Sequence, residues 1–125
     1  MTSCRVLVVN DDVGLAKSVQ RFLAGHGFDT RVAYDGAAAL ELLVNWPADV
    51  VLLDLIMPGL DGWGFLQHRS ASAVLQRALV LVWSVAASDD LQRAYSLGAT
   101  ECLSRTQSTP GDLLAAINKL VAPTH

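Results

Sequence analysis

Hydrophobic positions along the chain follow two patterns that alternate. Short, almost continuously apolar runs rich in β-branched residues occupy positions 4–9, 49–54 and 78–83. Such runs, which lack polar alternation, are typical of strands buried on both faces of a sheet. A more mixed run at 28–34 suits an edge strand, and positions 100–104 form a weaker fifth candidate.

Between these runs, apolar residues recur at helical spacing. The helical stretches are marked by Leu15, Val19, Phe22 and Leu23; by Leu40, Leu43 and Val44; by Leu91, Ala94 and Tyr95; and by Leu113, Ile117, Leu120 and Val121, with a shorter helix after Gly62. Ser108 or Thr109 is expected to cap the last helix. Five strands alternating with five helices predict right-handed crossovers and an α/β fold, with a doubly wound parallel sheet covered on both faces.

Length and charge narrow the classes of protein. With 125 residues, of which 52% are hydrophobic, the chain is expected to form a single domain over residues 1–125. A net charge of −3 without a basic stripe argues against direct nucleic-acid binding by this chain. No long apolar stretch is present to span or enter a membrane, so a soluble, cytoplasmic chain is expected. Cys4 and Cys102 lie in apolar runs and are interpreted as buried thiols, not metal or redox ligands.

Polar residues gather where the predicted strands end. Asp54 ends the third strand, Asn10 and Asp11 follow the first, Ser84 follows the fourth, and Arg105 comes just past the fifth. In open parallel sheets, ligands bind beyond the carboxyl ends of the strands, where the strand order reverses. The sequence therefore predicts one polar site at this edge.

The carboxylates of this edge suggest a metal ion. If the first and third strands are neighbours, about 4.8 Å apart, Asp11 and Asp54 can both point at one ion. Two carboxylates that lie close together repel and need a cation or a proton. Oxygen ligands at a half-open, water-accessible site favour Mg²⁺ over zinc or copper.

Five segments carry a family resemblance. They read VLVVNDDVGLAKSVQRFLAGHGF (6–28), YDGAAALELL (34–43), DVVLLDLIMPGLDGWGFL (49–66), LVLVWS (79–84) and AYSLGATECLSRT (94–106). The chain resembles a response-regulator receiver domain of two-component signalling over essentially its whole length. The resemblance implies a flavodoxin-like fold with strand order 2-1-3-4-5. Asp61 is expected to be a turn residue or a helix cap.

The resemblance also implies a role for each site residue. Asp54 would accept a phosphoryl group from a phosphohistidine of a histidine kinase or phosphotransfer protein. Asp11, Asp54 and the backbone carbonyl of Ile56 would hold Mg²⁺, with Asn10 accepting a hydrogen bond from a metal-bound water. Ser84 and Arg105 would contact the phosphoryl oxygens.

A switch surface follows from the same resemblance. Phosphorylation would change the outer face formed by the fourth helix, the fifth strand and the fifth helix. An output domain or downstream protein would bind this face, and a second copy of the chain is one candidate partner there. Cys102, Trp83 and Tyr95 are candidate residues of this switch.

Three positions depart from the family pattern. Asn10 stands where the first acid is expected, Arg105 replaces a lysine, and Cys102 replaces the aromatic residue of the fifth strand. These departures leave open an alternative in which the chain is a pseudo-receiver that binds partners without being phosphorylated. Trp83 or Tyr95 is a candidate to compensate for the missing aromatic.

An enzyme is the remaining alternative, and the sequence argues against it. A phosphohydrolase with an aspartate nucleophile would need a second Asp two residues after the first, where Ile56 stands. No glycine-rich phosphate loop follows the first strand, which excludes a nucleotide-binding site of that kind. A signalling protein that is not an enzyme is therefore expected.

Overall fold

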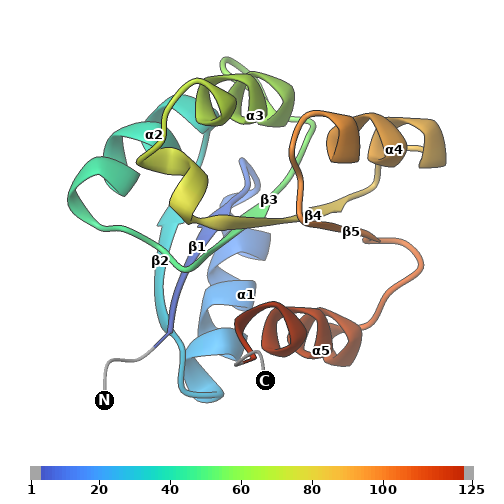
Figure 1. Ribbon diagram of the computed structural model, residues 1–125. Helices are drawn as coiled ribbons and strands as arrows, with labels where there is room; N and C mark the ends of the chain where they lie inside the picture. The colour runs from blue at the N-terminus through green and yellow to red at the C-terminus, as the bar shows by residue number, and fades with distance from the viewer. Residues whose placement is uncertain (1–3, 123–125) are drawn as a thin grey trace.

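The computed structural model describes residues 4–122, which form one parallel sheet covered by helices on both faces (Figure 1). Strands β1 to β5 run over Arg5–Val9, Asp29–Ala33, Val50–Leu53, Leu79–Ser84 and Glu101–Ser104, and helices α1 to α5 over Val13–Gly25, Gly36–Asn45, Gly62–Ser70, Ser88–Ser96 and Pro110–Val121. The strand order is β2-β1-β3-β4-β5. The predicted α/β fold and strand order are confirmed.

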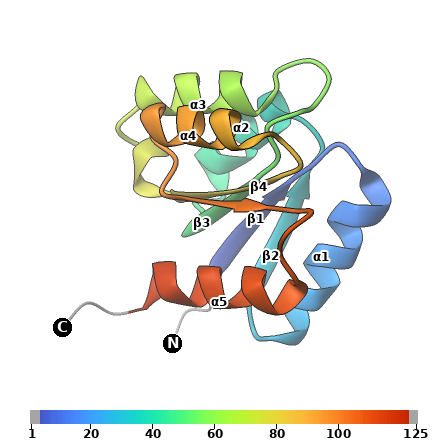
Figure 2. The ribbon, with the colours of Figure 1, turned by 90° about the vertical axis from the view of Figure 1, so that its right-hand side faces the viewer.

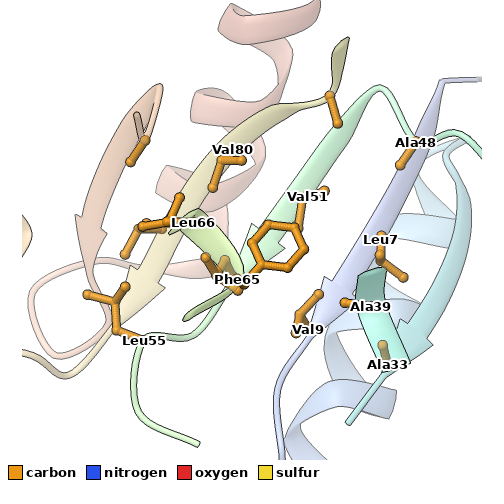
Figure 3. Packing of buried hydrophobic residues seen from close by; sticks show 14 of the residues in the cluster. Leu7, Val9, Ala33, Ala39, Ala48, Val51, Leu55, Phe65, Leu66 and Val80 are labelled. Carbon is orange, nitrogen blue, oxygen red and sulfur yellow. The ribbon is translucent and has the colours of Figure 1, made fainter. Parts of the chain in front are cut away.

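Each face of the sheet has its own core. Helices α2, α3 and α4 cover one face, and α1 and α5 cover the other (Figures 1 and 2). On the first face, Phe65 and Leu66 of α3 are fully buried with Val51 and Val80 (Figure 3). The central strand β3 is buried at every position, because helices cover both of its faces. This explains why its sequence shows no polar alternation.

Side-chain caps fix the helix starts at the carboxyl edge of the sheet. Asp12, Asp35 and Asp61 each accept a hydrogen bond from a backbone N–H in the first turn of α1, α2 and α3. Thr109 caps α5 in a reciprocal capping box with Asp112. Each cap satisfies amides that have no partner within the helix, so the turns that follow the strands are held firmly. Thr109, not Ser108, is the cap of the last helix.

The segment between α3 and β4 holds a short element that the sequence pattern does not reveal. A 3-10 helix, η1, spans Leu75–Arg77. Beside it, the buried guanidinium of Arg69 donates to the carbonyls of Gln76, Ala78 and Gly98, at 2.8 Å to Ala78 at the closest. Arg69 thus ties the end of α3 to the starts of β4 and β5.

None of the helices within residues 4–122 has both the length and the apolar character needed to cross a bilayer.

Both cysteines are free. The Cys4 thiol is partly buried and lies near Asp49, and burial is the larger of the causes that raise its pKa to about 11. Neither cysteine carries the low pKa that marks a reactive thiolate, because burial also raises the pKa of Cys102 to about 11.

Candidate functional site

Asp54 lies directly after β3, in the pocket formed by the carboxyl ends of the central strands. Its backbone N–H donates to the carbonyl of Val9 at 3.0 Å, which ties the end of β3 to the end of β1. The residue is only 5% exposed. Oδ1 accepts hydrogen bonds from the Ser84 hydroxyl at 2.8 Å and from the backbone N–H of Ile56 at 3.3 Å. The carboxylate is therefore held in one orientation.

Ser84 is the last residue of β4 and is fully buried. Because β4 is the neighbour of β3, its end comes beside Asp54 without any long side chain having to reach across. The Ser84 oxygen also accepts a longer hydrogen bond from the Ala86 N–H, at 3.4 Å. The hydroxyl therefore connects the carboxylate to the loop that precedes α4.

Arg105 brings a positive charge to the same carboxylate. Its backbone N–H donates to the Ser84 carbonyl at 2.9 Å, which places the residue just past the paired ends of β4 and β5. Its Nη1 lies 3.6 Å from Oδ2 of Asp54, close enough for an ion pair but too far for a hydrogen bond. Nη1 is buried and has no hydrogen-bond partner among the described residues. An incoming oxygen atom near Asp54 would satisfy this donor.

Asn10 and Asp11 follow β1 on the other side of Asp54. Asn10 is 4% exposed, and its Oδ1 accepts the backbone N–H of Asp12 at 2.9 Å, which shapes the turn into α1. Asp11 is exposed. The turn therefore presents one free carboxylate to solvent and keeps the Asn10 amide inside.

Close packing beneath the site requires a glycine. Gly62, the first residue of α3, donates its N–H to the carbonyl of Leu55 at 3.1 Å. A Cβ at this position would lie 2.5 Å from the carbonyl oxygen of Asp54 and 2.6 Å from Cα of Leu55. Only glycine lets α3 begin this close to the turn that carries Asp54.

Comparison with known proteins places this geometry in a family. The family model of the response regulator receiver domain matches residues 6–118. The chain belongs to the response regulator receiver family. As a receiver domain it is a signalling domain of the two-component type, as the sequence predicted.

Curated relatives of this receiver domain are named as a probable transcriptional regulator or as a DNA-binding response regulator. It is 27% identical over 121 residues to a probable transcriptional regulator, ycf29, of Pyropia yezoensis, covering 96% of this chain and 54% of that protein. Over 58 residues it is 48% identical to the DNA-binding response regulator MtrA of Mycobacterium tuberculosis, covering 46% of this chain and 25% of that protein. The chain spans about half the length of the ycf29 relatives it matches, and its 58-residue match to MtrA covers about a quarter of that protein.

Solved structures agree with the fold. A signal receiver domain from Bermanella marisrubri is 31% identical, with a TM-score of 0.87 and coverage of 96% of this chain and 99% of that one. A response regulator from Chloroflexus aurantiacus is 21% identical, with a TM-score of 0.89 and coverage of 98% and 100%. The second likeness shows the fold alone.

The donor atoms available at the site of this receiver domain are oxygens, which suit Mg²⁺. Within residues 4–122, the His, Cys, Asp and Glu side chains form no group of three or more that would hold a metal ion. Asp11 and Asp54 are acids that follow the neighbouring strands β1 and β3, and further ligands would be backbone carbonyls and water. Mg²⁺ is commonly bound by one or two carboxylates and keeps several waters, so the residues present fit it.

Two of the three candidate switch residues, Cys102 and Tyr95, lie together, and Trp83 lies apart from them. Cys102 is on the α2/α3/α4 face, where its Sγ lies 3.6 Å from the carbonyl of Leu91 in α4. Tyr95 of α4 accepts the backbone N–H of Cys102 at 3.0 Å and donates to the carboxylate of Glu101. Burial and the bond to Glu101 raise the pKa of Tyr95 to about 12. Trp83 packs on the opposite face of the sheet, with the side chains of α1 and α5.

The structure adds one residue near the site that the sequence reasoning assigned only to capping. Ser108 accepts a hydrogen bond from Nε1 of Trp83 at 3.3 Å and donates to the carbonyl of Ser104 at 2.6 Å. The two partners of this contact are 25 residues apart. No local pattern signals it, because it depends on how the loop after β5 folds back over the end of β4.

Proposed function

We propose that this receiver domain is a phosphoacceptor, with Asp54 as the residue that becomes phosphorylated. One observation supports this most directly: a buried carboxylate lies beside a buried hydroxyl, from Ser84, and beside a guanidinium nitrogen of Arg105 that has no hydrogen-bond partner among the described residues. A phosphoryl group on Asp54 would bring new oxygens to both donors. Charge-assisted hydrogen bonds of this kind stabilise a phosphorylated state.

The chemistry is a phosphoryl transfer from a phosphohistidine. An oxygen of the ionised Asp54 attacks phosphorus, the P–N bond breaks, and its electron pair stays on the imidazole, which leaves and takes a proton from solvent. The product is a mixed anhydride between Asp54 and phosphate. Ser84 and the Ile56 N–H hold Oδ1, so the carboxylate is oriented before the donor arrives.

We also propose that Asp11, Asp54 and the backbone carbonyl of Ile56 hold Mg²⁺, with Asn10 bonded to a water of the ion. When bound, the ion supplies positive charge that offsets the charge of the phosphoryl oxygens. Arg105 and Ser84 then contact other oxygens of the same group. Because Oδ1 of Asn10 already accepts one backbone N–H, only its second lone pair is free for that water.

The partners proposed for this chain follow from its family. A histidine kinase or phosphotransfer protein would supply the phosphoryl group in the cytoplasm, and an output domain or downstream protein would respond to it. The outer face of α4, β5 and α5 is the proposed surface for the response, including any pairing with a second copy. We propose that the receiver domain occupies residues 1–125. The names of ycf29 and MtrA favour an output in transcription, which a part of the protein other than the receiver domain would carry out.

The test is incubation of the protein with Mg²⁺ and phosphoramidate, followed by intact mass spectrometry. We expect a gain of one phosphoryl group, which is lost in Asp54→Asn and when EDTA replaces Mg²⁺. Asp61→Asn is the matched control, because Asp61 is an acid of the same loop that caps α3. No gain in the unchanged protein would overturn the proposal and favour the pseudo-receiver alternative. A gain that persists in Asp54→Asn would mean that another residue is phosphorylated, and would overturn the proposal that Asp54 is the acceptor.

A further inference from the structure

The side chain of Arg105 lies between Asp54 and an aromatic ring. Its guanidinium carbon is 5.5 Å from the ring centre of Trp83, within the range of a cation–π contact. Its Nη1 is 3.6 Å from the Asp54 carboxylate. The Arg105 guanidinium therefore lies near both the Asp54 carboxylate and the Trp83 ring.

Trp83 is held through its ring nitrogen and also lines a pocket. Its Nε1 donates to Ser108, which is bonded in turn to the Ser104 carbonyl, so the ring is tied to the loop that carries Arg105. The ring also lines a partly open pocket of about 190 Å³ between α1 and α5, together with Leu15, Ser18, Val19, Phe22, Pro110 and Leu113. The ring can shift into this space without the overpacking that a closed core would impose.

On the other face of the sheet, Trp46 and Trp63 stack with arginines that lie outside the Asp54 site, Arg5 and Arg31 for Trp46 and Arg93 for Trp63. Cys102 occupies the β5 position on the α4 side, and its short side chain has no ring that could pass a movement at the site to more distant residues. Tyr95, the nearest aromatic of α4, is bonded to the Cys102 N–H and to Glu101. Trp83 contacts Arg105 of the Asp54 site directly.

We propose that Trp83 is a positioning residue for Arg105, and that its ring moves when a phosphoryl group is present on Asp54, so that the response reaches the α1/α5 face as well. This inference rests on the proposed function. The contact between Arg105 and Asp54 is longer than a charge-assisted hydrogen bond, so the guanidinium has room to approach added oxygens. Its approach changes the stacking with Trp83, and the pocket accommodates the ring.

The first experiment follows the ring itself. The protein is labelled with 5-fluorotryptophan, and the three ¹⁹F resonances are assigned with Trp→Phe variants at positions 46, 63 and 83. Mg²⁺ and phosphoramidate are then added, and mass spectrometry of the same sample records phosphorylation. We expect the Trp83 resonance to shift, while that of Trp46, buried beneath two arginines at the far end of the strands, stays in place. Asp54→Asn should abolish the shift.

The second experiment tests the positioning of Arg105 by Trp83 through the rate of phosphorylation. Trp83→Leu should slow phosphorylation by phosphoramidate about two- to fivefold, the size expected for loss of one cation–π contact, whereas Trp83→Phe should retain most of the rate. In an Arg105→Gln background, Trp83→Leu should have no further effect. A purely structural role for the ring would slow both backgrounds equally.

The outcomes separate the two proposals. A sample that gains no phosphoryl group overturns the proposed function, and this inference with it. A sample that gains the group while the Trp83 resonance stays in place, or in which Trp83→Leu and Trp83→Phe react at the same rate, overturns the inference alone. The resonance measurement uses the unchanged protein, so it decides the matter even if Trp83→Leu does not fold.

Discussion

Removing the Ser84 hydroxyl tests whether the buried hydrogen bond to Asp54 stabilises the domain. The bond is 2.8 Å long, and its partners are 0% and 5% exposed, so water cannot replace the lost donor without opening the site. A hydrogen bond to a charged group contributes about 1.5–3 kcal/mol. We expect Ser84→Ala to lower the free energy of unfolding by that amount at neutral pH without Mg²⁺. The weaker bond from Ala86, at 3.4 Å, adds little.

Urea unfolding is the assay, and a second serine supplies the control. Ser104 is the register partner of Ser84 on β5, but within residues 4–122 its hydroxyl bonds only to the exposed Thr106, so Ser104→Ala should cost less than about 0.5 kcal/mol. Asp54→Asn keeps an acceptor oxygen without the charge, so in that background the cost of Ser84→Ala should fall to about 0.5–1.5 kcal/mol. Equal costs for Ser84→Ala and Ser104→Ala would refute the reasoning.

Three further changes test the surroundings of the site. Gly62→Ala should destabilise the domain by about 1–3 kcal/mol in urea melts, because its Cβ would lie 2.5 Å from a backbone oxygen. Gly111→Ala on α5, where the added Cβ would make only an ordinary van der Waals contact at 3.6 Å from Oγ1 of Thr109, should instead stabilise the domain by up to about 1 kcal/mol. A loss of stability in Gly111→Ala as large as that in Gly62→Ala would contradict the packing argument. Arg69→Lys should lower the free energy of unfolding by about 1.5–3 kcal/mol, since an ammonium cannot reach three carbonyls at once, whereas the exposed Arg77→Lys should be neutral. Asn10→Asp should tighten Mg²⁺ binding by about 1 kcal/mol in a fluorescence titration and slightly destabilise the metal-free domain; unchanged or weaker binding would mean that residue 10 does not act on the ion.

Strands and their order were predictable because two signals agreed. Continuous apolar runs indicated strands buried on both faces, and the family resemblance supplied the order that residues alone left open. The contact between Asp54 and Ser84 follows from these two facts, since side chains at the ends of neighbouring parallel strands lie close together. The position of Arg105 was predictable to the same degree, because its backbone continues the pairing of β5 with β4.

The contacts of long side chains were not predictable. The stacking of Arg105 on Trp83 and the bond from Trp83 to Ser108 depend on rotamers and on the path of one loop, which no periodicity encodes. The same holds for Arg69, whose burial contradicts the usual exposure of arginine and depends on three carbonyls from distant segments. The short helix η1 was missed because three residues are too few to show a period.

The bond between Tyr95 and the Cys102 N–H limits how any partner can bind to β5. As the last strand of the sheet, β5 has an open side, and an amide left free there would be available to pair with an extended segment of another chain. The Tyr95 hydroxyl, with the Glu101 carboxylate beside it, occupies this amide. Strand addition at this edge would first have to break those bonds, so a protein that recognises the α4, β5 and α5 surface is expected to bind it through side chains, as a rigid face, and the sheet does not readily continue into a second molecule.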